Sequence, residues 1–297
     1  MILDGKKLAD ELEHELANQV SSLALSGRPP CLAVVIVGED PASQVYVSHK
    51  AKACKRIGIR SIMKTLPANT SQKTLIAEVE RLNADPKVDG ILVQLPVPEQ
   101  INPDAIIEAI DPSKDIDGFH PVNAGRLLIG TGNPLVPCTP QGVHYMLQKS
   151  DIDPAGKRVV IIGRSNIVGK PMAAILMQRA SGCNATVTIA HSRSKDLQSI
   201  CLEADIIIAC VGIANFVDSD MVKEGAVIID VGINRVEDAT RKSGYRLVGD
   251  VDFEAVKDRC SAITPVPGGV GPLTIAMLLK NTILAYQNRS AALVTNG

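Results

Sequence analysis

The sequence predicts a two-domain α/β protein built on parallel sheets. Seven apolar runs rich in β-branched residues recur along the 297 residues. Most are nearly continuous rather than alternating, which is typical of strands covered on both faces. Stretches with helical periodicity separate them, so repeated βαβ units are the simplest interpretation. The predicted strands cover residues 31–38, 59–66, 89–95, 158–163, 186–190, 205–212 and 226–232.

Five stretches between these runs have the periodicity of helices. The best defined covers residues 41–57, because Asp40 can cap it, Pro41 suits its first position and Gly58 suits its exit. The other four predicted helices cover residues 5–25, 71–83, 171–181 and 273–288.

An irregular segment at residues 130–141, with three prolines and two glycines, marks the predicted domain boundary. We predict one domain over residues 1–139 and a second over 140–271. The final segment, 272–297, is expected to return to the first domain as a long helix. Clefts between domains are common ligand sites, so we expect the functional site in such a cleft.

Composition argues against several classes of protein. The formal net charge is -1, which gives no broad field for nucleic acid or an anionic membrane. No apolar run reaches the roughly 18 residues of a membrane span. The seven cysteines are scattered without a CxxC pair, and the histidines show no metal-ligand spacing. We expect a cytoplasmic protein with mostly buried thiols, no metal, no nucleic-acid or membrane partner, and small-molecule ligands.

The strand at 158–163 ends in a glycine-rich turn that leads into a helical pattern. Such a turn exposes backbone N–H groups at a helix N-terminus, where the pyrophosphate of a dinucleotide binds. Ser165 replaces the usual middle glycine, so the motif is matched loosely and a plain strand-to-helix turn is the alternative. The predicted contacts in this turn are Gly163, Arg164, Ser165, Ile167 and Val168.

The residues after the next predicted strand favour NADP over NAD. NAD sites place an acid there for the ribose hydroxyls, whereas this chain has Ser192 and Arg193 and no carboxylate before Asp196. A hydroxyl and a guanidinium suit the additional phosphate, and Arg164 can add a second cation. A solvated surface charge is the alternative for Arg193. We therefore predict NADP as the cofactor, with Ser192 and Arg193 among its contacts.

Tyr46 and Lys50 lie four residues apart on the predicted helix 41–57, so both can point at one site. A lone lysine on a helix is usually solvated, so its wider context matters. That context is a series of motifs along the chain. They are YVSHK (46–50), VQLPVP (93–98), KDIDGFHPVNAGRL (114–127), PCTPQG (137–142), GRSNIVGKP (163–171), DVGIN (230–234), GDVDF (249–253) and PVPGGVGP (265–272).

In this order the motifs resemble the bifunctional methylenetetrahydrofolate dehydrogenase/cyclohydrolase family over nearly the whole chain. The resemblance implies NADP-dependent oxidation of 5,10-methylenetetrahydrofolate to the methenyl form, followed by hydrolysis to 10-formyltetrahydrofolate. It also implies a homodimer. The folate-binding catalytic domain would be 1–139 joined by 272–297, and the Rossmann-type NADP-binding domain would be 140–271.

The resemblance also implies roles for individual residues. Lys50 matches the catalytic lysine, which as a neutral amine takes a proton from water, and Gln94 matches the glutamine that bonds the lysine or that water. Tyr46 offers a ring for stacking along the folate. Asp117 matches the pterin-binding carboxylate, whereas Asp115 caps a turn or pairs with Lys114.

The implied catalytic residues are thus Tyr46, Lys50, Gln94 and Asp117. The remaining implied contacts are Val93, Leu95, Pro267, Gly268, Gly269, Val270 and Gly271 for the substrate and Ile233 for the cofactor.

Two other functions compete with this one. The first is an NADP-dependent dehydrogenase of another small substrate without hydrolytic activity. The second is a catalytically silent nucleotide-binding protein, which has no reason to keep Tyr46, Lys50, Gln94 and Asp117 together.

Overall fold

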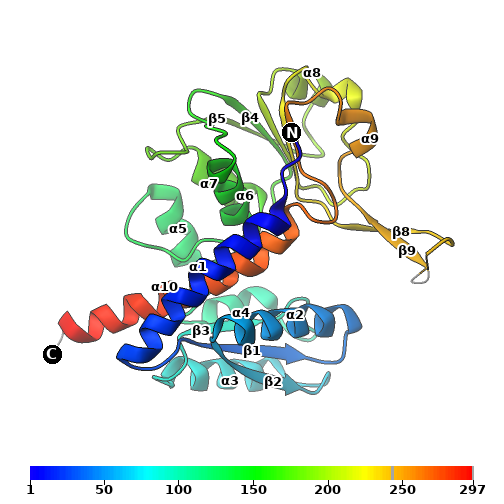
Figure 1. Cartoon of the computed structure of the whole chain (residues 1–297). Coiled ribbons are helices and arrows are strands. Elements are labelled where there is room, and N and C mark those ends of the chain that lie inside the picture. The colour runs from blue at the N-terminus through cyan, green and yellow to red at the C-terminus, as the bar shows by residue number, and fades with distance from the viewer. Residues whose placement is uncertain (242–243, 296–297) are drawn as a thin grey trace. The chain divides into compact units, whose positions relative to one another are not determined.

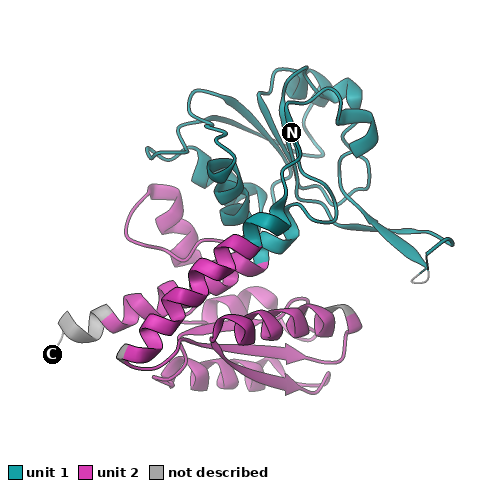
Figure 2. Cartoon of the chain, in the orientation of Figure 1, with its two compact units in different colours: residues 1–9, 139–274 teal, residues 10–138, 275–297 magenta. Residues whose placement is uncertain are grey.

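The computed structural model describes residues 1–241 and 244–295, which divide into two compact units (Figure 2). Unit 1 comprises residues 1–9 and 139–274, and unit 2 comprises residues 10–138 and 275–297. Asn296 and Gly297, at the end of the predicted segment 272–297, lie outside the described residues.

Unit 2 is built on a three-stranded parallel sheet in the order β2-β1-β3. Its strands are β1 (Cys31–Val37), β2 (Arg60–Leu66) and β3 (Gly90–Val93). The central strand β1 is buried throughout, as its continuous apolar run predicts, whereas the edge strand β2 is largely exposed. Ala33, Val35 and Ile91 pack with Leu75 and Val79 of α3 into the core on one face of the sheet.

Helix α2 (Pro41–Ile57) begins and ends as the sequence predicts. The Asp40 carboxylate accepts a hydrogen bond of 2.7 Å from the Ser43 N–H, and Gly58 adopts the left-handed conformation with φ of 85°. The cap therefore fixes which side chains of α2 face the carboxyl ends of the strands. The other helices of unit 2 are α1 (Gly5–Ser26), α3 (Gln72–Ala84), α4 (Pro103–Ala109), α5 (Pro121–Ile129) and α10 (Val270–Thr295). Helices α1 and α10 begin in unit 1 and continue into unit 2.

Unit 1 contains a five-stranded parallel sheet in the order β10-β7-β6-β4-β5. Its strands are β4 (Arg158–Ile162), β5 (Thr186–Ala190), β6 (Ile206–Ala209), β7 (Val227–Asp230) and β10 (Ala262–Ile263). Because the strands are parallel, the segments that follow β4, β6 and β7 meet at one edge of the sheet. The helices are α6 (Cys138–Lys149), α7 (Gly169–Leu176), α8 (Leu197–Leu202) and α9 (Phe253–Val256), with a short 3₁₀ helix at Ser219–Met221.

The chain's first residues join unit 1 rather than the unit that contains most of the predicted first domain. The Leu3 N–H donates to the Ile263 carbonyl oxygen at 2.8 Å, and the Ile263 N–H donates to the Met1 carbonyl oxygen at 3.0 Å. Ile2 thereby pairs in parallel with Ile263 at the end of the sheet. Residues 1–9 thus cover an edge that would otherwise present unpaired backbone groups.

A two-stranded antiparallel hairpin, β8 (Asn234–Glu237) and β9 (Tyr245–Val248), extends from unit 1 (Figure 1). The Arg235 guanidinium lies 4.9 Å from the centroid of the Tyr245 ring. This hairpin was not predicted from the sequence.

All seven predicted strands are present and all pair in parallel, which confirms the predicted fold class. Two helical predictions need correction. Helix α7 ends at Leu176 instead of residue 181, because the Ala185 N–H bonds back to the Leu176 carbonyl oxygen as the chain turns into β5. Helix α6 begins at Cys138, inside the segment predicted to be irregular; its Pro140 falls in the first turn, where no intrahelical N–H bond is lost.

The cysteine side chains are mostly buried. All seven cysteines are free and five of them are buried, as predicted. Among the residues that the structure describes, no helix is long and apolar enough to cross a membrane.

Candidate functional site

The structure brings Lys50 and Gln94 together in unit 2. Lys50 lies on α2, and Gln94 directly follows β3, where its N–H continues the sheet by donating to the Val35 carbonyl oxygen. The Lys50 ammonium donates to Gln94 Oε1 at 3.1 Å, and Gln94 Nε2 donates to the Leu95 carbonyl oxygen at 2.7 Å. The glutamine amide is therefore held with its oxygen toward the lysine.

Asp117 lies close to this pair, in the loop that precedes α5. Burial raises the pKa of Asp117 to about 6, the Lys50 ammonium opposes the shift, and Asp115 adds to it. The Asp117 carboxylate keeps some exposure to solvent and has no side-chain hydrogen bond among the described residues. It is available to accept hydrogen bonds from a ligand.

Tyr46 and the two residues beside Gln94 differ in how they can contribute. The Tyr46 side chain lies one helical turn before Lys50 and is 48% exposed, so its ring is open to a ligand. Val93 is buried and belongs to the core of unit 2. Leu95 accepts the Gln94 amide through its carbonyl oxygen. Their assignments as substrate contacts stay predictions.

The loop that carries Asp117 is fixed by the buried Asp115. Its carboxylate accepts hydrogen bonds from the His120 N–H at 2.8 Å and from Asn123 Nδ2 at 2.9 Å. Asn281 on α10 holds the same loop by donating from Nδ2 to the Ile116 carbonyl oxygen at 2.8 Å. Asp115 is therefore structural and caps the turn before α5, which is the first of the two predicted alternatives; the second alternative, pairing with Lys114, does not occur.

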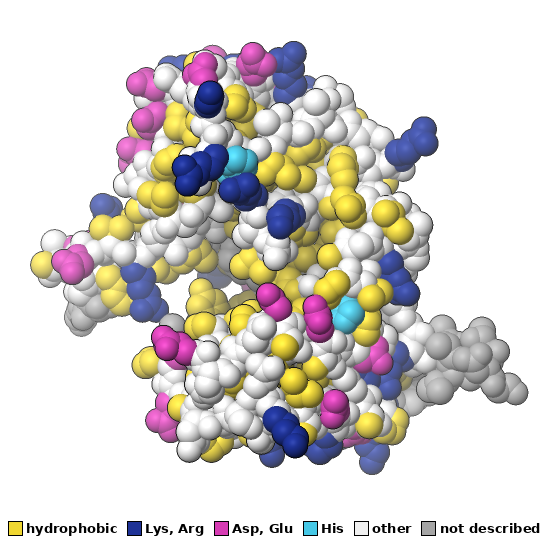
Figure 3. All heavy atoms as spheres, turned by 180° about the vertical axis from the view of Figure 1, so that it is seen from behind, with side chains coloured by type: hydrophobic (Ala, Val, Ile, Leu, Met, Phe, Trp, Pro, Cys, Tyr) yellow, Lys and Arg dark blue, Asp and Glu magenta, His cyan; other side chains and the backbone are white. Residues whose placement is uncertain are grey.

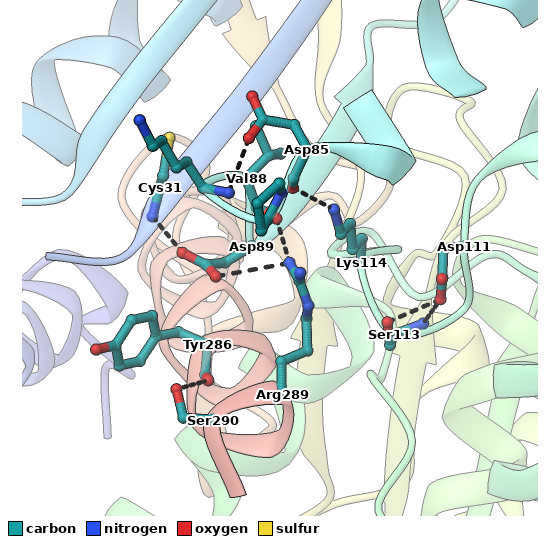
Figure 4. Close-up of polar contacts among 12 residues, drawn as sticks. Cys31, Asp85, Val88, Asp89, Asp111, Ser113, Lys114, Tyr286, Arg289 and Ser290 are labelled. Atoms are coloured by element: carbon teal, nitrogen blue, oxygen red, sulfur yellow. Dashed lines mark hydrogen bonds and ion pairs between the residues drawn. The ribbon is translucent and has the colours of Figure 1, made fainter. Parts of the chain in front are cut away.

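Lys114 instead binds the end of helix α3 (Figure 4). Its side chain is 1% exposed, and its ammonium donates to the carbonyl oxygens of Leu82, Asn83 and Asp85 at 3.0, 2.7 and 2.8 Å. A cation at a helix C-terminus satisfies carbonyls that lack intrahelical partners and opposes the helix dipole. Lys114 thus anchors the segment leading to Asp117 to a preformed helix.

A second cation in Figure 4 approaches the same region from α10. Arg289 donates to the Val88 carbonyl oxygen and lies 3.7 Å from the Asp89 carboxylate. Asp89 is buried and also pairs with Arg28, at 2.6 Å, and with the Cys31 N–H, at 2.8 Å. Burial, with Arg289 adding to its effect, lowers the pKa of Lys114 to about 8.

Replacing Lys114 by Met is expected to destabilise unit 2 by about 3 kcal/mol, because three backbone carbonyls lose their partner. The measurement is urea unfolding followed by circular dichroism, since the chain has no tryptophan. Lys87→Met in the same segment is the control: the Lys87 side chain is exposed, and its loss should change the free energy of unfolding by less than about 0.5 kcal/mol. Equal stability of the two variants would contradict the anchoring role.

The glycine-rich turn after β4 has the close packing that a dinucleotide site requires. Gly163 has φ of 131°, and a Cβ atom there would lie 2.4 Å from the Cys210 carbonyl oxygen. A Cβ at Gly169 would lie 2.2 Å from the Gly163 carbonyl oxygen. No larger residue fits either position, so the turn is more specialised than an ordinary strand-to-helix connection.

Ser165 takes the place of the missing middle glycine in a defined way. Its hydroxyl oxygen accepts a hydrogen bond of 3.1 Å from the Val168 N–H and one of 3.4 Å from the Gly169 N–H, at the start of α7. The serine therefore caps this helix from within the turn. Ile167, beside it, is 48% exposed, as is Ile233 after β7.

Two exposed arginines follow the strands β4 and β5. The segment after β5 is shaped by the His191 ring, whose Nδ1 accepts from the Arg193 N–H at 3.1 Å, while Ser192 is exposed. The guanidinium groups of Arg164 and Arg193 have no acidic partner among the described residues. On the face shown in Figure 3, basic side chains gather beside a histidine, whereas elsewhere the two signs of charge are interspersed. Unpaired cations beside a glycine turn fit a dinucleotide that carries an additional phosphate.

The predicted substrate wall, Pro267–Gly271, belongs to unit 1, whereas the Lys50 group belongs to unit 2. The Lys6 N–H donates to the Gly268 carbonyl oxygen at 3.0 Å, and a Cβ at Gly269 would lie 2.5 Å from the Pro265 carbonyl oxygen. Val270 is buried at the start of α10. The segment is closely packed, and its contact with substrate stays a prediction.

The motifs DVGIN and GDVDF contain Asp230 and Asp250, for which no role was predicted from the sequence. Both aspartates are buried at the carboxyl edge of the unit 1 sheet. The sequence held one signal for them. Asp230 comes directly after the apolar run of a strand, and Asp250 comes directly after a glycine.

These features define a class: a two-unit α/β protein that binds a phosphate-bearing dinucleotide with one unit and presents a lysine, a glutamine and a carboxylate to a second ligand with the other. Comparison with known proteins agrees with this class. The NAD(P)-binding domain of tetrahydrofolate dehydrogenase/cyclohydrolase matches residues 137–290, and the catalytic domain matches residues 3–117. The chain belongs to the tetrahydrofolate dehydrogenase/cyclohydrolase family.

Individual relatives are similar over almost their whole length. Bifunctional protein FolD of Protochlamydia amoebophila is 55% identical over 286 residues, which covers 96% of this chain and 97% of that protein. The crystal structure of the bifunctional enzyme FolD from Campylobacter jejuni is 50% identical, with a TM-score of 0.92 over 97% of this chain and 99% of that one. The Trypanosoma brucei enzyme, solved with NADP cofactor and an inhibitor, is 41% identical, with a TM-score of 0.91 over 98% of each chain.

Proposed function

We propose that this protein oxidises 5,10-methylenetetrahydrofolate with NADP and hydrolyses the resulting methenyl cation to 10-formyltetrahydrofolate. The observation that carries the proposal is the Lys50–Gln94 hydrogen bond of 3.1 Å beside Asp117, in the unit that contains the match to the catalytic domain. The Campylobacter jejuni protein, a bifunctional methylenetetrahydrofolate dehydrogenase/cyclohydrolase of similar length, supports it.

In the hydrolytic step, Lys50 acts as the base. A neutral lysine amine takes a proton from water while the water oxygen bonds to the methenyl carbon. The bond from that carbon to N5 then breaks, its electron pair stays on N5, and N5 takes up the proton held by Lys50. The remaining hydroxyl proton is released to solvent as the C=O bond forms, which leaves the formyl group on N10. One amine N–H donating to Gln94 Oε1 fixes the direction of the lysine lone pair.

Asp117 and Tyr46 hold the substrate in this scheme. The Asp117 carboxylate accepts hydrogen bonds from the N–H groups of the pterin, and the exposed Tyr46 ring stacks along the folate. Holding both ends of the substrate places its one-carbon bridge at Lys50. These roles are proposals that follow from the family and from the availability of both side chains.

In the oxidative step, bound NADP supplies the acceptor for a hydride from the one-carbon bridge. The turn that follows Gly163 provides backbone N–H groups for the pyrophosphate. Arg193 and Arg164 provide cations for the additional phosphate, because no acid in the described part of the chain pairs with either of them. The exposed Ile167 and Ile233 supply apolar contacts.

The proposal is tested by following NADPH and the methenyl intermediate together after mixing the protein with 5,10-methylenetetrahydrofolate and NADP. NADPH formation with little lasting methenyl signal supports both activities. Accumulation of the methenyl compound would leave only a dehydrogenase, and no NADPH at all would refute the proposal.

Arg193→Ala is expected to weaken NADP binding by about tenfold or more while leaving NAD binding nearly unchanged, because it removes a charge-assisted bond to the phosphate. The ratio of kcat/KM with the two cofactors measures this effect. Lys195→Ala, two residues further along and equally exposed, is the control and should leave the ratio unaltered. An unchanged ratio in Arg193→Ala would show that the phosphate binds elsewhere.

We also propose that the enzyme acts in the cytoplasm as a homodimer and that its 10-formyl product serves purine biosynthesis. Seven free thiols, most of them buried, support a reducing compartment. The homodimer and the use of the product follow from the family resemblance alone. Analytical ultracentrifugation of the purified protein tests the oligomeric state.

A further inference from the structure

Two buried aspartates organise the carboxyl edge of the unit 1 sheet, outside the residues so far assigned to the cofactor. Asp230 ends β7 and is 3% exposed, and Asp250 follows β9 and is 0% exposed. Buried carboxylates are rare unless their oxygens are satisfied, so their partners show what they hold in place.

Asp250 binds two segments at once. Its Oδ2 accepts hydrogen bonds from the Val211 N–H at 2.6 Å and from the Gly212 N–H at 2.9 Å, in the loop after β6. Its Oδ1 accepts one of 2.9 Å from Asn234 Nδ2, at the start of β8. One carboxylate thus ties the loop after β6 to the segment after β7 that contains Ile233.

The loop held by Asp250 packs directly on the glycine turn. Cys210 begins this loop, and its N–H donates to the Ile162 carbonyl oxygen at 2.9 Å. A Cβ atom at Gly163 would lie 2.4 Å from the Cys210 carbonyl oxygen and 2.7 Å from its sulfur. A shift of the loop therefore moves the backbone that limits the turn where the pyrophosphate would bind.

Asp230 fixes Asp250 in turn. Its carboxylate accepts hydrogen bonds of 2.9 Å each from the N–H groups of Asp250, Val251 and Gly232. The packing leaves no room for side chains on the intervening glycines: a Cβ at Gly249 would lie 1.8 Å from Asp230 Oδ2, and one at Gly232 would lie 2.1 Å from Asp250 Oδ1. The Asp250 backbone is therefore fixed separately from its side chain.

We propose that Asp250 is a positioning residue for NADP. Its carboxylate sets the spacing between the glycine turn at Gly163 and the segment that carries Ile233, through the Val211–Gly212 loop and Asn234. Asp250 does not touch the reacting atoms, and its effect reaches the cofactor through these backbone segments. The inference rests on the proposed function, which assigns NADP to this unit.

The test is Asp250→Asn, which keeps the size of the side chain but removes its charge and one of its two acceptor oxygens, so the charge-assisted hydrogen bonds from Val211, Gly212 and Asn234 cannot all be kept. We expect the KM for NADP and the Kd for NADPH to rise about tenfold. The KM for the folate should stay the same. Hydrolysis of 5,10-methenyltetrahydrofolate, which consumes no NADP, should also stay the same, whereas general unfolding would reduce it. The Kd is measured by NADPH fluorescence in a chain without tryptophan background.

Asp205→Asn is the matched control at the opposite edge of the same sheet. Asp205 accepts hydrogen bonds from the Arg158 N–H at 2.9 Å and from Lys223 Nζ at 2.6 Å. Like Asp250, it therefore bonds both a backbone donor and a side-chain donor, but it lies away from the glycine turn. We expect its Kd for NADPH to be unchanged.

If Asp250→Asn fails to fold, Asn234→Ala removes a single donor to the same carboxylate. We expect about a threefold rise in the Kd for NADPH from this milder change. If the wild type turns over substrate and the folded variants bind NADPH with an unchanged Kd, the inference is overturned. Lack of wild-type turnover would instead refute the proposed function.

Discussion

Replacing Lys50 by Met is expected to abolish hydrolysis of 5,10-methenyltetrahydrofolate while part of the dehydrogenase activity survives. Methionine preserves the length and apolar stem of the side chain but cannot take a proton. Loss of a general base costs about 10²- to 10⁴-fold in rate. Hydride transfer needs no acid or base, only alignment of the two ligands. Separate assays of NADPH formation and of methenyl consumption measure the two effects.

Lys52→Met is the matched control for this variant. Lys52 lies two residues further along α2 with an exposed side chain, so its replacement changes the same net charge without reaching Gln94. Both activities should remain at the wild-type level. Equal loss of both activities in Lys50→Met, with folate binding intact, would show that the lysine does not act as a separate base.

The parts of the fold that follow from burial were predictable from the sequence. Continuous apolar runs such as residues 31–37 and 158–162 are buried along nearly their whole length, which is typical of parallel strands covered on both faces. The hairpin β8–β9 was not predictable in the same way, because its side chains are partly exposed and its register depends on pairing with a strand that lacks a clear apolar pattern. Short helices such as α4 and α5 give too few turns for a periodic signal.

The site shows a similar division. Tyr46, Lys50 and Gln94 were suggested by local spacing and by motif, and the structure brings Lys50 and Gln94 into hydrogen-bond contact. The partners of Lys114 were not predictable, because they are carbonyl groups at the end of a helix some thirty residues earlier in the chain. The same applies to Asp250, whose three donors come from two other segments. Sequence motifs name reactive side chains better than the buried groups that position them.

Asp117→Asn is expected to impair both activities through the folate rather than through the chemistry. The amide can donate where the carboxylate only accepts, so one of two pterin N–H groups meets a donor instead of an acceptor. Loss of a charge-assisted pair raises the KM for the folate by about 100-fold in both assays, with a smaller change in the KM for NADP. Asp111→Asn, earlier in the same segment, is the control, because among the described residues its side chain hydrogen-bonds to Ser113 alone, within its own turn.

The pH dependence separates this role from a structural one. Because burial raises the pKa of Asp117 to about 6, the carboxylate form is present above that value and is lost as the pH falls through it. In the wild type, the KM for the folate should therefore rise by about tenfold per pH unit below that range. In Asp117→Asn the KM should be high and nearly independent of pH over the same interval, because the amide does not titrate. A variant that retained the wild-type pH profile would assign the titration to another group and remove Asp117 from pterin recognition.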